Sequence, residues 1–416
     1  MEAGIDEKEF AGLNLEGDIV DEESHTEYKK GQQLLELDDV VTATKVVEEI
    51  VYVATLGGNV LVFDPRNEVT KESFSVTDEK GKQFCITCFD VMGQKLVAGN
   101  VEGKIGIWDL TSKEREKMWK VHKQKVSKVL FVPEDKLIYS VGHDGYFYAT
   151  SYAFEEKKVV HGFISCTCPL SCLATEPGRP SVVYIGSWDG HVKKIDLQAK
   201  SCIQVLRADQ NGDSPIRALC IAPAPPPPPG AKKPKKKKGQ AEEGPVVQYV
   251  LVVAHGIGQI LSFDLATNTM LVSSYLGHKD VVNDLCVHNN QIFSAADDKS
   301  VRLFDLAKGT PLDMLSGHKN GVVCMTIAEE SLITGGYDRG LRCYKIPKIE
   351  SAIALNLLKR EEEKKSALLN THTVLLLLLG WFIGNGGGGL CAVASFVVVS
   401  AAALCDLLVA CHLVLV

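Results

Sequence analysis

The sequence predicts an all-β fold, a seven-bladed propeller, because one short phrase recurs along the chain at a nearly constant spacing. Three copies are GKIGIWDL at residues 103–110, SWDGHVKKIDL at 187–197 and DDKSVRLFDL at 297–306. Each copy has a turn residue, an alternating apolar strand and a closing acid, which is the pattern of a strand that follows a tight turn. The pattern favours one structural unit repeated along the chain over a single active site.

The spacing of the phrase gives the size and number of the units. Its closing position falls at Asp64, Asp109, Ser151, Asp196, Asp264, Asp305 and Lys345, so the gaps are 45, 42, 45, 68, 41 and 40 residues. The long gap contains residues 222–245, which are rich in Pro and Lys, and 68 − 24 leaves 44. A period of roughly 40–45 residues is typical of four-stranded propeller blades, so about seven blades are predicted.

These motifs resemble those of the WD40-repeat family. The strongest marks are Gly277-His278 and Gly317-His318 ahead of units, and Trp108-Asp109 and Phe304-Asp305 at strand ends. A turn acid stands seven residues before the closing position at Glu102, Asp144, Asp189, Asp298 and Asp338, whereas Gly57 and Ile257 stand there in the first and fifth units. The resemblance covers about residues 32–347 and implies a single propeller domain over that range.

The resemblance also implies structural work for polar residues. In the family pattern, a His before the blade, a Ser or Thr of the second strand, the turn Asp and a Trp of the third strand form a buried hydrogen-bonded set. The matching sets here are His278, Ser294 and Asp298, then His318, Thr334 and Asp338, then His122, Ser140 and Asp144. Phe304, Tyr344 and Thr150 replace the Trp, so the three sets lack the indole donor.

The same residue types also suggest a hydrolase, because a His, a hydroxyl and an Asp can activate a nucleophile. Repetition argues against catalysis, since one chain does not need the same triad in successive units, whereas each blade needs its own polar clamp. The sequence also has no GxxxxGK[ST] loop and no HExxH motif. We therefore predict a protein that is not an enzyme and that needs no cofactor.

Composition agrees with a large intracellular β-domain. The chain has 416 residues, of which 45% are hydrophobic and 23% charged, and its 13 cysteines are irregularly spaced without a secretory signal. These features predict free thiols in a reducing compartment. Two groups have the residue types of metal ligands, namely Cys85 with Cys88, and His161 with Cys166, Cys168 and Cys172. The first pair would point to opposite faces of a strand, and a blade boundary at Pro169 explains the second group, so no metal is predicted.

The first blade is expected to follow an acidic arm. Residues 1–31 lack hydrophobic periodicity, which predicts disorder. Short strands are then expected at residues 32–37, 41–47, 50–55 and 60–64. Because the chain termini of such rings commonly complete one shared blade, residues 33–37 are our candidate for the outer closing strand. Residues 352–358 are the competing candidate.

The stretch 222–245 is predicted to be a flexible surface loop. Its proline run favours an extended chain, and its cation block repels itself and cannot pack. The block consists of Lys232, Lys233, Lys235, Lys236, Lys237 and Lys238. Such a block suits a nuclear import signal, or a salt-sensitive contact with RNA or an acidic surface, and a solvated insertion is the alternative. The net charge of −7 argues against nucleic-acid binding by the ring itself.

The character of the sequence changes after the ring. Residues 348–366 are charged and predict a helical linker, and residues 367–416 form an apolar tail. As a helix, residues 390–416 are long enough to cross a bilayer, although Asp406 lies within them. One hypothesis is therefore a tail-anchored protein with its propeller in the cytosol. The alternatives are an extension folded against the ring and a sequence end that belongs to no folded unit.

A narrower resemblance concerns individual blades. Residues 169–175 (PLSCLAT), 317–319 (GHK), 324–327 (CMTI) and 335–338 (GGYD) are similar to blades of nuclear zinc-finger proteins that carry a WD40 ring. This resemblance implies a nuclear, RNA-associated setting. The chain departs from those proteins after residue 347, where no Cys/His ligand spacing follows.

Fold and family together predict a protein-interaction scaffold that docks other proteins or peptides on the faces of the ring. The predicted contact residues are His143, Tyr146, Trp188, His191, Asp297, Lys299, Tyr337 and Arg339. The alternative for each of them is a role in shaping a tight turn. The alternative functions are a tail-anchored membrane adaptor and a nuclear RNA-associated protein. The expected location is accordingly the nucleus or cytoplasm, with a membrane-anchored form as the alternative.

Overall fold

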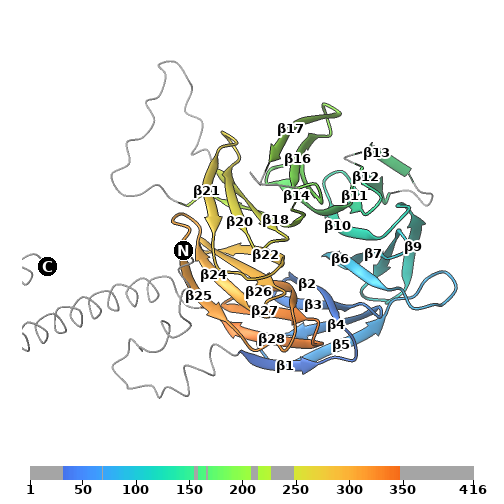
Figure 1. Ribbon diagram of the computed structural model, residues 1–416. Coiled ribbons are helices and arrows are strands. Elements are labelled where there is room, and N and C mark those ends of the chain that lie inside the picture. The colour runs from blue at the N-terminus through green and yellow to red at the C-terminus, as the bar shows by residue number, and fades with distance from the viewer. Residues whose placement is uncertain are drawn as a thin grey trace, which may run out of the picture. The chain divides into compact units, whose positions relative to one another are not determined.

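The computed structural model describes residues 31–67, 69–153, 158–164, 167–207, 214–225 and 248–346. These residues belong to the first of two compact units, Met1–Pro347. They form 28 strands and no helix, arranged as seven four-stranded antiparallel sheets (Figure 1). The prediction of an all-β, seven-bladed propeller is confirmed.

The first four blades follow one another along the chain, each running from an innermost to an outermost strand. Blade 1 comprises β2 (Val41–Val47), β3 (Ile50–Thr55), β4 (Asn59–Asp64) and β5 (Val69–Ser75). Blade 2 comprises β6 (Ile86–Met92), β7 (Lys95–Asn100), β8 (Lys104–Asp109) and β9 (Arg115–Lys120). Blade 3 comprises β10 (Val126–Val132), β11 (Leu137–Gly142), β12 (Tyr146–Ser151) and β13 (Lys158–Ile164). Blade 4 comprises β14 (Leu170–Glu176), β15 (Arg179–Ser187), β16 (His191–Asp196) and β17 (Ser201–Arg207).

The last three blades include the one that closes the ring. Blade 5 comprises β18 (Ile216–Pro223), β19 (Tyr249–His255), β20 (Ile260–Asp264) and β21 (Met270–Tyr275). Blade 6 comprises β22 (Val282–His288), β23 (Gln291–Ala296), β24 (Val301–Asp305) and β25 (Pro311–Leu315). Blade 7 comprises β26 (Val322–Ala328), β27 (Ser331–Gly336), β28 (Gly340–Lys345) and, as its outermost strand, β1 (Gln32–Glu36).

The hydrophobic core lies between the blades. Alternate side chains of a strand point to opposite faces of the sheet, so each blade can pack on both of its neighbours. Among the described residues, seven buried clusters each combine two successive blades, and one of them joins blade 7 to blade 1. The innermost strands adjoin one another in the same order, and β26 adjoins β2. Apolar packing therefore continues around the whole ring.

Polar side chains of the innermost strands add links between blades. Asp90 on β6 accepts a hydrogen bond from the backbone N–H of Phe131 on β10 at 2.9 Å. Asp284 on β22 accepts one from the N–H of Met325 on β26, also at 2.9 Å. Each bond joins the innermost strands of two neighbouring blades, which are about 40 residues apart in the sequence. It therefore restrains the rotation of one blade against the next.

The N-terminal strand closes the ring. β1 pairs with β28 in antiparallel register, from Gln32 opposite Cys343 to Glu36 opposite Gly340. This pairing confirms the prediction that residues 33–37 supply the outer closing strand, and the competing segment, 352–358, lies outside the described residues. Without β1, blade 7 would present the backbone of β28 as an open edge.

The closing acids of the sequence phrase end the third strand of their blades. All seven closing positions fall at the last residue of β4, β8, β12, β16, β20, β24 or β28. The Asp carboxylate accepts backbone N–H groups two or three residues on, as Asp305 does from Ala307 and Lys308 at 2.9 Å. This Asx turn leads into the outer strand. Lys345 needs no such acid, because the outer strand of blade 7 comes from the other end of the domain.

The Pro/Lys-rich stretch begins at the end of β18. That strand continues to Pro223, which pairs with Tyr249, so two residues of the predicted stretch 222–245 belong to the strand. Proline is tolerated there because it is the terminal residue of the strand. The lysine block, the acidic residues 1–30, the linker and the apolar tail lie outside the described residues. Over the described part of the chain, no helix has the length and apolar character needed to cross a membrane.

Candidate functional site

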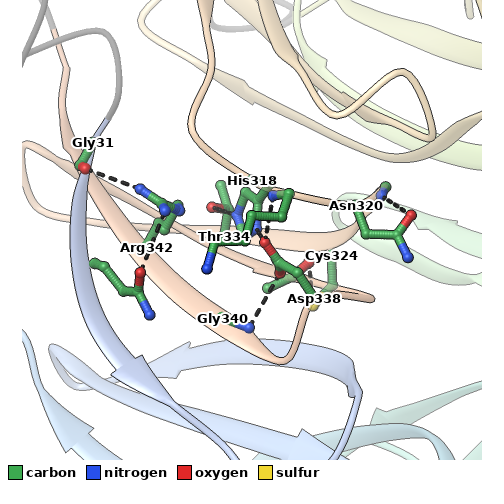
Figure 2. A network of polar contacts seen from close by, with 12 residues as sticks. Gly31, His318, Asn320, Cys324, Thr334, Asp338, Gly340 and Arg342 are labelled. Atoms are coloured by element: carbon green, nitrogen blue, oxygen red, sulfur yellow. Dashed lines mark hydrogen bonds and ion pairs between the residues drawn. The ribbon is translucent and has the colours of Figure 1, made fainter.

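The seventh blade holds the first of three His-hydroxyl-Asp sets, which we call clamps. His318 lies in the loop before β26, Thr334 on β27 and Asp338 in the turn before β28 (Figure 2). The Nδ1–H of His318 donates to Asp338 at 2.9 Å, and its Nε2 accepts the hydroxyl of Thr334 at 2.8 Å. Asp338 also accepts the backbone N–H groups of Lys319 at 2.7 Å and Gly340 at 3.1 Å. The clamp therefore ties an inter-blade loop to a turn.

The other two clamps repeat this geometry. In blade 3, Nδ1 of His122 lies 2.9 Å from Asp144, and its Nε2 lies 2.9 Å from Ser140. In blade 6, the corresponding distances from His278 are 2.8 Å to Asp298 and 2.7 Å to Ser294. The structure thus brings all nine sequence-predicted clamp residues into three sets with equivalent places in their blades.

Burial decides what the clamps can do chemically. The hydroxyl residues Ser140, Ser294 and Thr334 and the three histidine side chains are all 0% exposed. A hydroxyl nucleophile has to reach its substrate, and none of these can. For Asp338, burial opposes ionisation, but the hydrogen bond from His318 and the backbone N–H groups outweigh it, so its pKa lies below the usual value. Burial lowers the pKa of His318, which favours the neutral ring that this hydrogen bonding requires.

The clamps need a small residue two positions before the turn acid. A Cβ on Gly336 would lie 2.7 Å from Nδ1 of His318, and one on Gly142 would lie 2.6 Å from Nδ1 of His122. In blades 1, 2 and 4 the residue at this position is polar, and its side chain forms hydrogen bonds with the backbone of the turn. For example, Asn100 accepts the backbone N–H of Lys104 at 2.8 Å. The sequence carries this second pattern as Thr55, Asn100 and Ser187, which our sequence analysis did not single out.

The residue after the turn acid has a left-handed backbone in all seven blades. Five of these residues are Gly58, Gly103, Gly145, Gly190 and Gly258, and the other two are Lys299 at φ 70° and Arg339 at φ 62°. At Gly103 a Cβ would meet the carbonyl oxygen of His122 at 2.1 Å, so only glycine fits there. Lys299 and Arg339, which we predicted as contact residues, therefore hold positions that define the turn.

The residue before the turn acid lies next to the start of the innermost strand. In six of the seven blades its backbone N–H donates to the carbonyl oxygen of the residue directly before that strand, as from His143 to Lys125 at 2.9 Å and from Tyr337 to Gly321 at 2.9 Å. We call the face that carries these turns the turn face, and the seven equivalent positions the axial rim. The rim consists of Leu56, Val101, His143, Trp188, Gly256, Asp297 and Tyr337.

The structure separates the eight predicted contact residues by position. His143, Trp188, Asp297 and Tyr337 belong to the axial rim, and Lys299 and Arg339 to the left-handed turn positions. Tyr146 and His191 begin the third strands of their blades. Tyr146 stacks on Tyr148 at 5.6 Å, and Nδ1 of His191 lies 3.3 Å from Asp189, so both side chains already contact their own blades.

Three residues that sequence reasoning missed also lie at the rim. Leu56 and Val101 are aliphatic, so a search for aromatic and charged residues passed over them, yet they are 39% and 46% exposed. Their position before the turn acid was the available signal. Arg217 is the second residue of β18 and had no local signal at all. Burial contributes most to lowering the pKa of His143, and the positive charges of Lys125 and Arg217 lower it further. The charge of Arg217 also acts on Tyr337, so this cation lies among the rim residues.

The cysteines of the described residues do not assemble into a metal site. Within the described part of the chain, no group of three or more His, Cys, Asp or Glu side chains could hold a metal ion. Of the predicted candidates, Cys88 lies on β6 and Cys85 just before it, and Cys166 falls outside the described residues. Burial raises the pKa of Cys88 and of Cys172 to about 11, so both thiols stay protonated at neutral pH.

Comparisons with known proteins bear on this architecture. A family model described as WD domain, G-beta repeat, matches residues 269–305 and 309–345, which cover much of blades 6 and 7. This chain belongs to the WD40-repeat family. The crystal structure of the computationally designed Ika8 protein is similar to this WD40 propeller with a TM-score of 0.54, over 76% of this chain and all of that one. At 18% identity that likeness concerns the fold alone.

Two curated relatives share short segments with the propeller. Mitochondrial division protein 1 of Mycosarcoma maydis is 38% identical over 60 residues, which are 14% of this chain and 7% of that protein. General transcriptional corepressor TUP1 of Saccharomyces cerevisiae is 35% identical over 86 residues, 18% of this chain and 12% of that protein. The matches thus span only a small part of either relative. WD40 propellers are typically protein-interaction scaffolds and generally not enzymes.

Proposed function

We propose that this WD40 propeller is a non-enzymatic scaffold that binds partner proteins or peptides on the axial rim of its turn face. The observation that carries the proposal is the gathering of exposed apolar and aromatic side chains at equivalent positions around one axis. Leu56, Val101 and Tyr337 are 39%, 46% and 43% exposed, although each stands on a hydrogen-bonded turn of a closed ring. Exposed large apolar groups on a rigid backbone are typical anchors of an interface.

The rim also offers little that must be reordered on binding. The rings of His143 and Trp188 meet edge to face at 5.2 Å, and Asp297 accepts a hydrogen bond from Asn283 at 2.6 Å. Because these side chains are already held, a partner loses less side-chain entropy on docking than it would on a mobile loop. The clamps hold three of the underlying turns in place. The supporting argument is therefore preorganisation together with exposed apolar area.

Site-specific photo-crosslinking tests this proposal. The full chain would carry a photoreactive phenylalanine at Tyr337 or, as the matched control, at Glu134 in the turn between β10 and β11, at the far end of the strands. We expect discrete partner adducts from position 337 and not from position 134. The double substitution of Leu56→Ser and Val101→Ser should reduce the adducts from position 337 about tenfold, because both remove apolar contact area at the rim.

Two results would contradict the proposal. Equal labelling from positions 134 and 337 would show that the turn face is not preferred. Unchanged adducts in the Leu56→Ser/Val101→Ser variant would show that binding does not use the rim. Both substitutions are at exposed turn positions, so the fold should be retained, and thermal unfolding of each variant would verify that point.

A further inference from the structure

We propose that the axial rim selects acidic partners, with a carboxylate side chain of a bound peptide entering between Arg217 and Lys128 on the turn face, a place that we call the mouth. The inference rests on the proposed function, because it names the chemistry of the segment that the rim would bind. It depends on the placement of two cations on innermost strands.

Arg217 and Lys128 flank blade 4 from its two neighbours. Arg217 is the second residue of β18 in blade 5, and Lys128 is the third residue of β10 in blade 3. Innermost strands begin at the turn face, so Arg217 and Lys128, each near the start of its strand, lie towards that face. Both act electrostatically on the thiol of Cys172, the third residue of β14 between them. The two positive charges therefore act on the same part of blade 4.

The point of convergence carries no anion of its own. Burial raises the pKa of the Cys172 thiol to about 11 despite both cations, so this group is neutral. Ser171, the neighbouring residue on β14, points its hydroxyl at the carbonyl oxygen of Ile216. Blade 4 thus places short, uncharged side chains between the two cations, and neither of these side chains would repel an incoming carboxylate.

Neither cation is neutralised by a direct ion pair. Among the described residues, Arg217 and Lys128 have no carboxylate within ion-pairing distance. Asp284 accepts two backbone N–H groups and is also the anion that acts most strongly on Lys128. Asp90 pairs with Lys45 at 2.9 Å, and Asp297 accepts a hydrogen bond from Asn283. Lys128 is solvent-exposed, and the strands around it disfavour its charge by desolvation, but nearby anions, Asp284 first, outweigh this effect and raise its pKa, so Lys128 remains charged. Guanidinium and ammonium groups together favour a carboxylate ligand.

The rim supplies the rest of such a site. Trp188 stands above β14, and its indole Nε1–H is buried without a hydrogen-bond partner among the described residues. Buried donors are normally satisfied, so this group is a further candidate for an acceptor on the ligand. His143 and Tyr337 lie close enough to Arg217 to feel its charge, and they line the same mouth. The site thus combines cations, a free donor and aromatic walls.

A partner is favoured over the chain's own acidic arm as the occupant. Residues 1–30 contain ten acidic and three basic side chains, so they have the complementary charge. However, the arm joins the ring at the start of β1, and Gln32 pairs with Cys343 near the end of β28. The turn-face end of β1 is Glu36, opposite Gly340. The arm therefore meets the ring at the opposite end of the strands from the mouth.

The test uses pools of short synthetic peptides with random flanks and one fixed central residue. Binding of each pool to the purified full chain would be measured by fluorescence anisotropy. We expect the pools with central Asp or Glu to bind best, with binding that weakens as salt is added. Arg217→Gln and Lys128→Gln should each weaken this binding roughly tenfold, since each removes a charge-assisted contact. Arg217→Glu should invert the preference towards central Lys.

Matched variants separate the possible results. Arg179→Gln removes a positive charge at the far end of β15 and should leave the preference unchanged. Deleting residues 1–30 should also leave it unchanged, whereas much tighter peptide binding after the deletion would assign the mouth to the arm and overturn the proposal. If central Gln pools bind as well as Glu pools but Tyr337→Ala abolishes binding, the charge preference is wrong and the rim still docks partners. If neither Tyr337→Ala nor Arg217→Gln affects binding, both proposals fail.

Discussion

At the scale of single residues, one carboxylate organises each clamp. Asp298 faces His278 at 2.8 Å, and it also accepts the backbone N–H of Lys279 at 3.1 Å and the hydroxyl of Ser300 at 2.6 Å. Burial opposes its charge, but these donors outweigh burial and hold its pKa well below the usual value. Such a carboxylate contributes more to the free energy of unfolding than a surface acid does, because its loss leaves several buried hydrogen-bond donors unsatisfied.

Removal of one clamp hydroxyl should destabilise the domain. Thr334→Val keeps the shape of the side chain but leaves Nε2 of His318 without its donor in a buried site. We expect a loss of about 1–3 kcal/mol in the free energy of unfolding, measured by denaturant titration. Thr326→Val, on the adjacent strand β26, is the control and should change stability by less than about 0.5 kcal/mol. Equal effects of the two substitutions would argue against the clamp.

The clamp should also make stability depend on pH. His318 has a folded pKa below its unfolded value, so the unfolded chain binds the proton first as pH falls. Stability should therefore decrease as pH drops below about 6.5, and the decrease should level off below the folded pKa. The free energy of unfolding measured across this window should fall less steeply in His318→Gln than in the unsubstituted chain. Parallel slopes would show that His318 does not titrate in this way.

A substitution at a left-handed turn position should stabilise the domain. Arg339 adopts φ 62°, where a side chain is strained, and its counterparts in five other blades are glycines. Arg339→Gly should stabilise the domain by up to about 1 kcal/mol, because relief of strain exceeds the entropy that glycine loses on folding. The melting temperature should rise accordingly. A lower melting temperature would indicate that the side chain makes contacts worth more than the strain.

At the scale of elements, β1 has the largest individual role. It covers the edge of β28, and its leucines Leu34 and Leu35, together with Leu37, pack on the cluster between blades 7 and 1. Arg342 of β28 also donates to the carbonyl oxygen of Gly31 at 3.2 Å (Figure 2). A strand from one end of the domain thus completes a blade formed by the other end, and the edge of β28 is covered.

Truncation at β1 should open the ring at this blade. A chain that lacks residues 1–37 loses the partial burial of three leucines, and we expect it to lose about 3 kcal/mol of stability. Hydrogen exchange should accelerate first in β26, β27 and β28, which lose their outer neighbour. A chain that lacks only residues 1–30 is the control and should unfold like the full chain. Uniform acceleration across all blades would contradict a local role.

At the scale of the whole molecule, the domain is a ring whose stability is shared among equivalent contact regions between neighbouring blades, which we call seams. Each buried cluster joins two neighbouring blades, and hydrogen bonds such as that from Thr87 to the carbonyl oxygen of Val126 at 2.7 Å add to the apolar contacts. A feature that touches no seam should therefore matter little for stability. β18 and β19 pair directly through Pro223 and Tyr249, so residues on either side of 226–247 form the hairpin of blade 5.

Shortening that stretch should leave the ring intact. Replacing residues 226–247 by a short Gly/Asn turn removes the lysine block but keeps both paired strands. We expect the melting temperature to change by no more than a few degrees, because loop length has only a weak effect on closure entropy. The same variant, followed by microscopy in cells, tests the nuclear import hypothesis. An unchanged distribution between nucleus and cytoplasm would contradict that hypothesis.

The sequence alone determined the fold and the position of its strands. The closing acids marked the ends of third strands, because turns and two-residue alternation are local properties of the chain. The resemblance to the WD40 family grouped His278, Ser294 and Asp298. The same local logic could not separate the predicted contact residues by position. Tyr146 and His191 begin third strands and contact their own blades, whereas His143 and Trp188 belong to the axial rim.

Only the tertiary structure decided what surrounds the axis. Arg217 and Lys128 are 89 residues apart in the sequence, and no motif links them. They converge because closure of the ring sets every innermost strand beside its neighbours, whatever their distance along the chain. The pairing of β1 with β28 was likewise decided by closure, since either end of the ring could have supplied the outer strand. Local pattern fixes each blade, and long-range packing assigns each residue its neighbours.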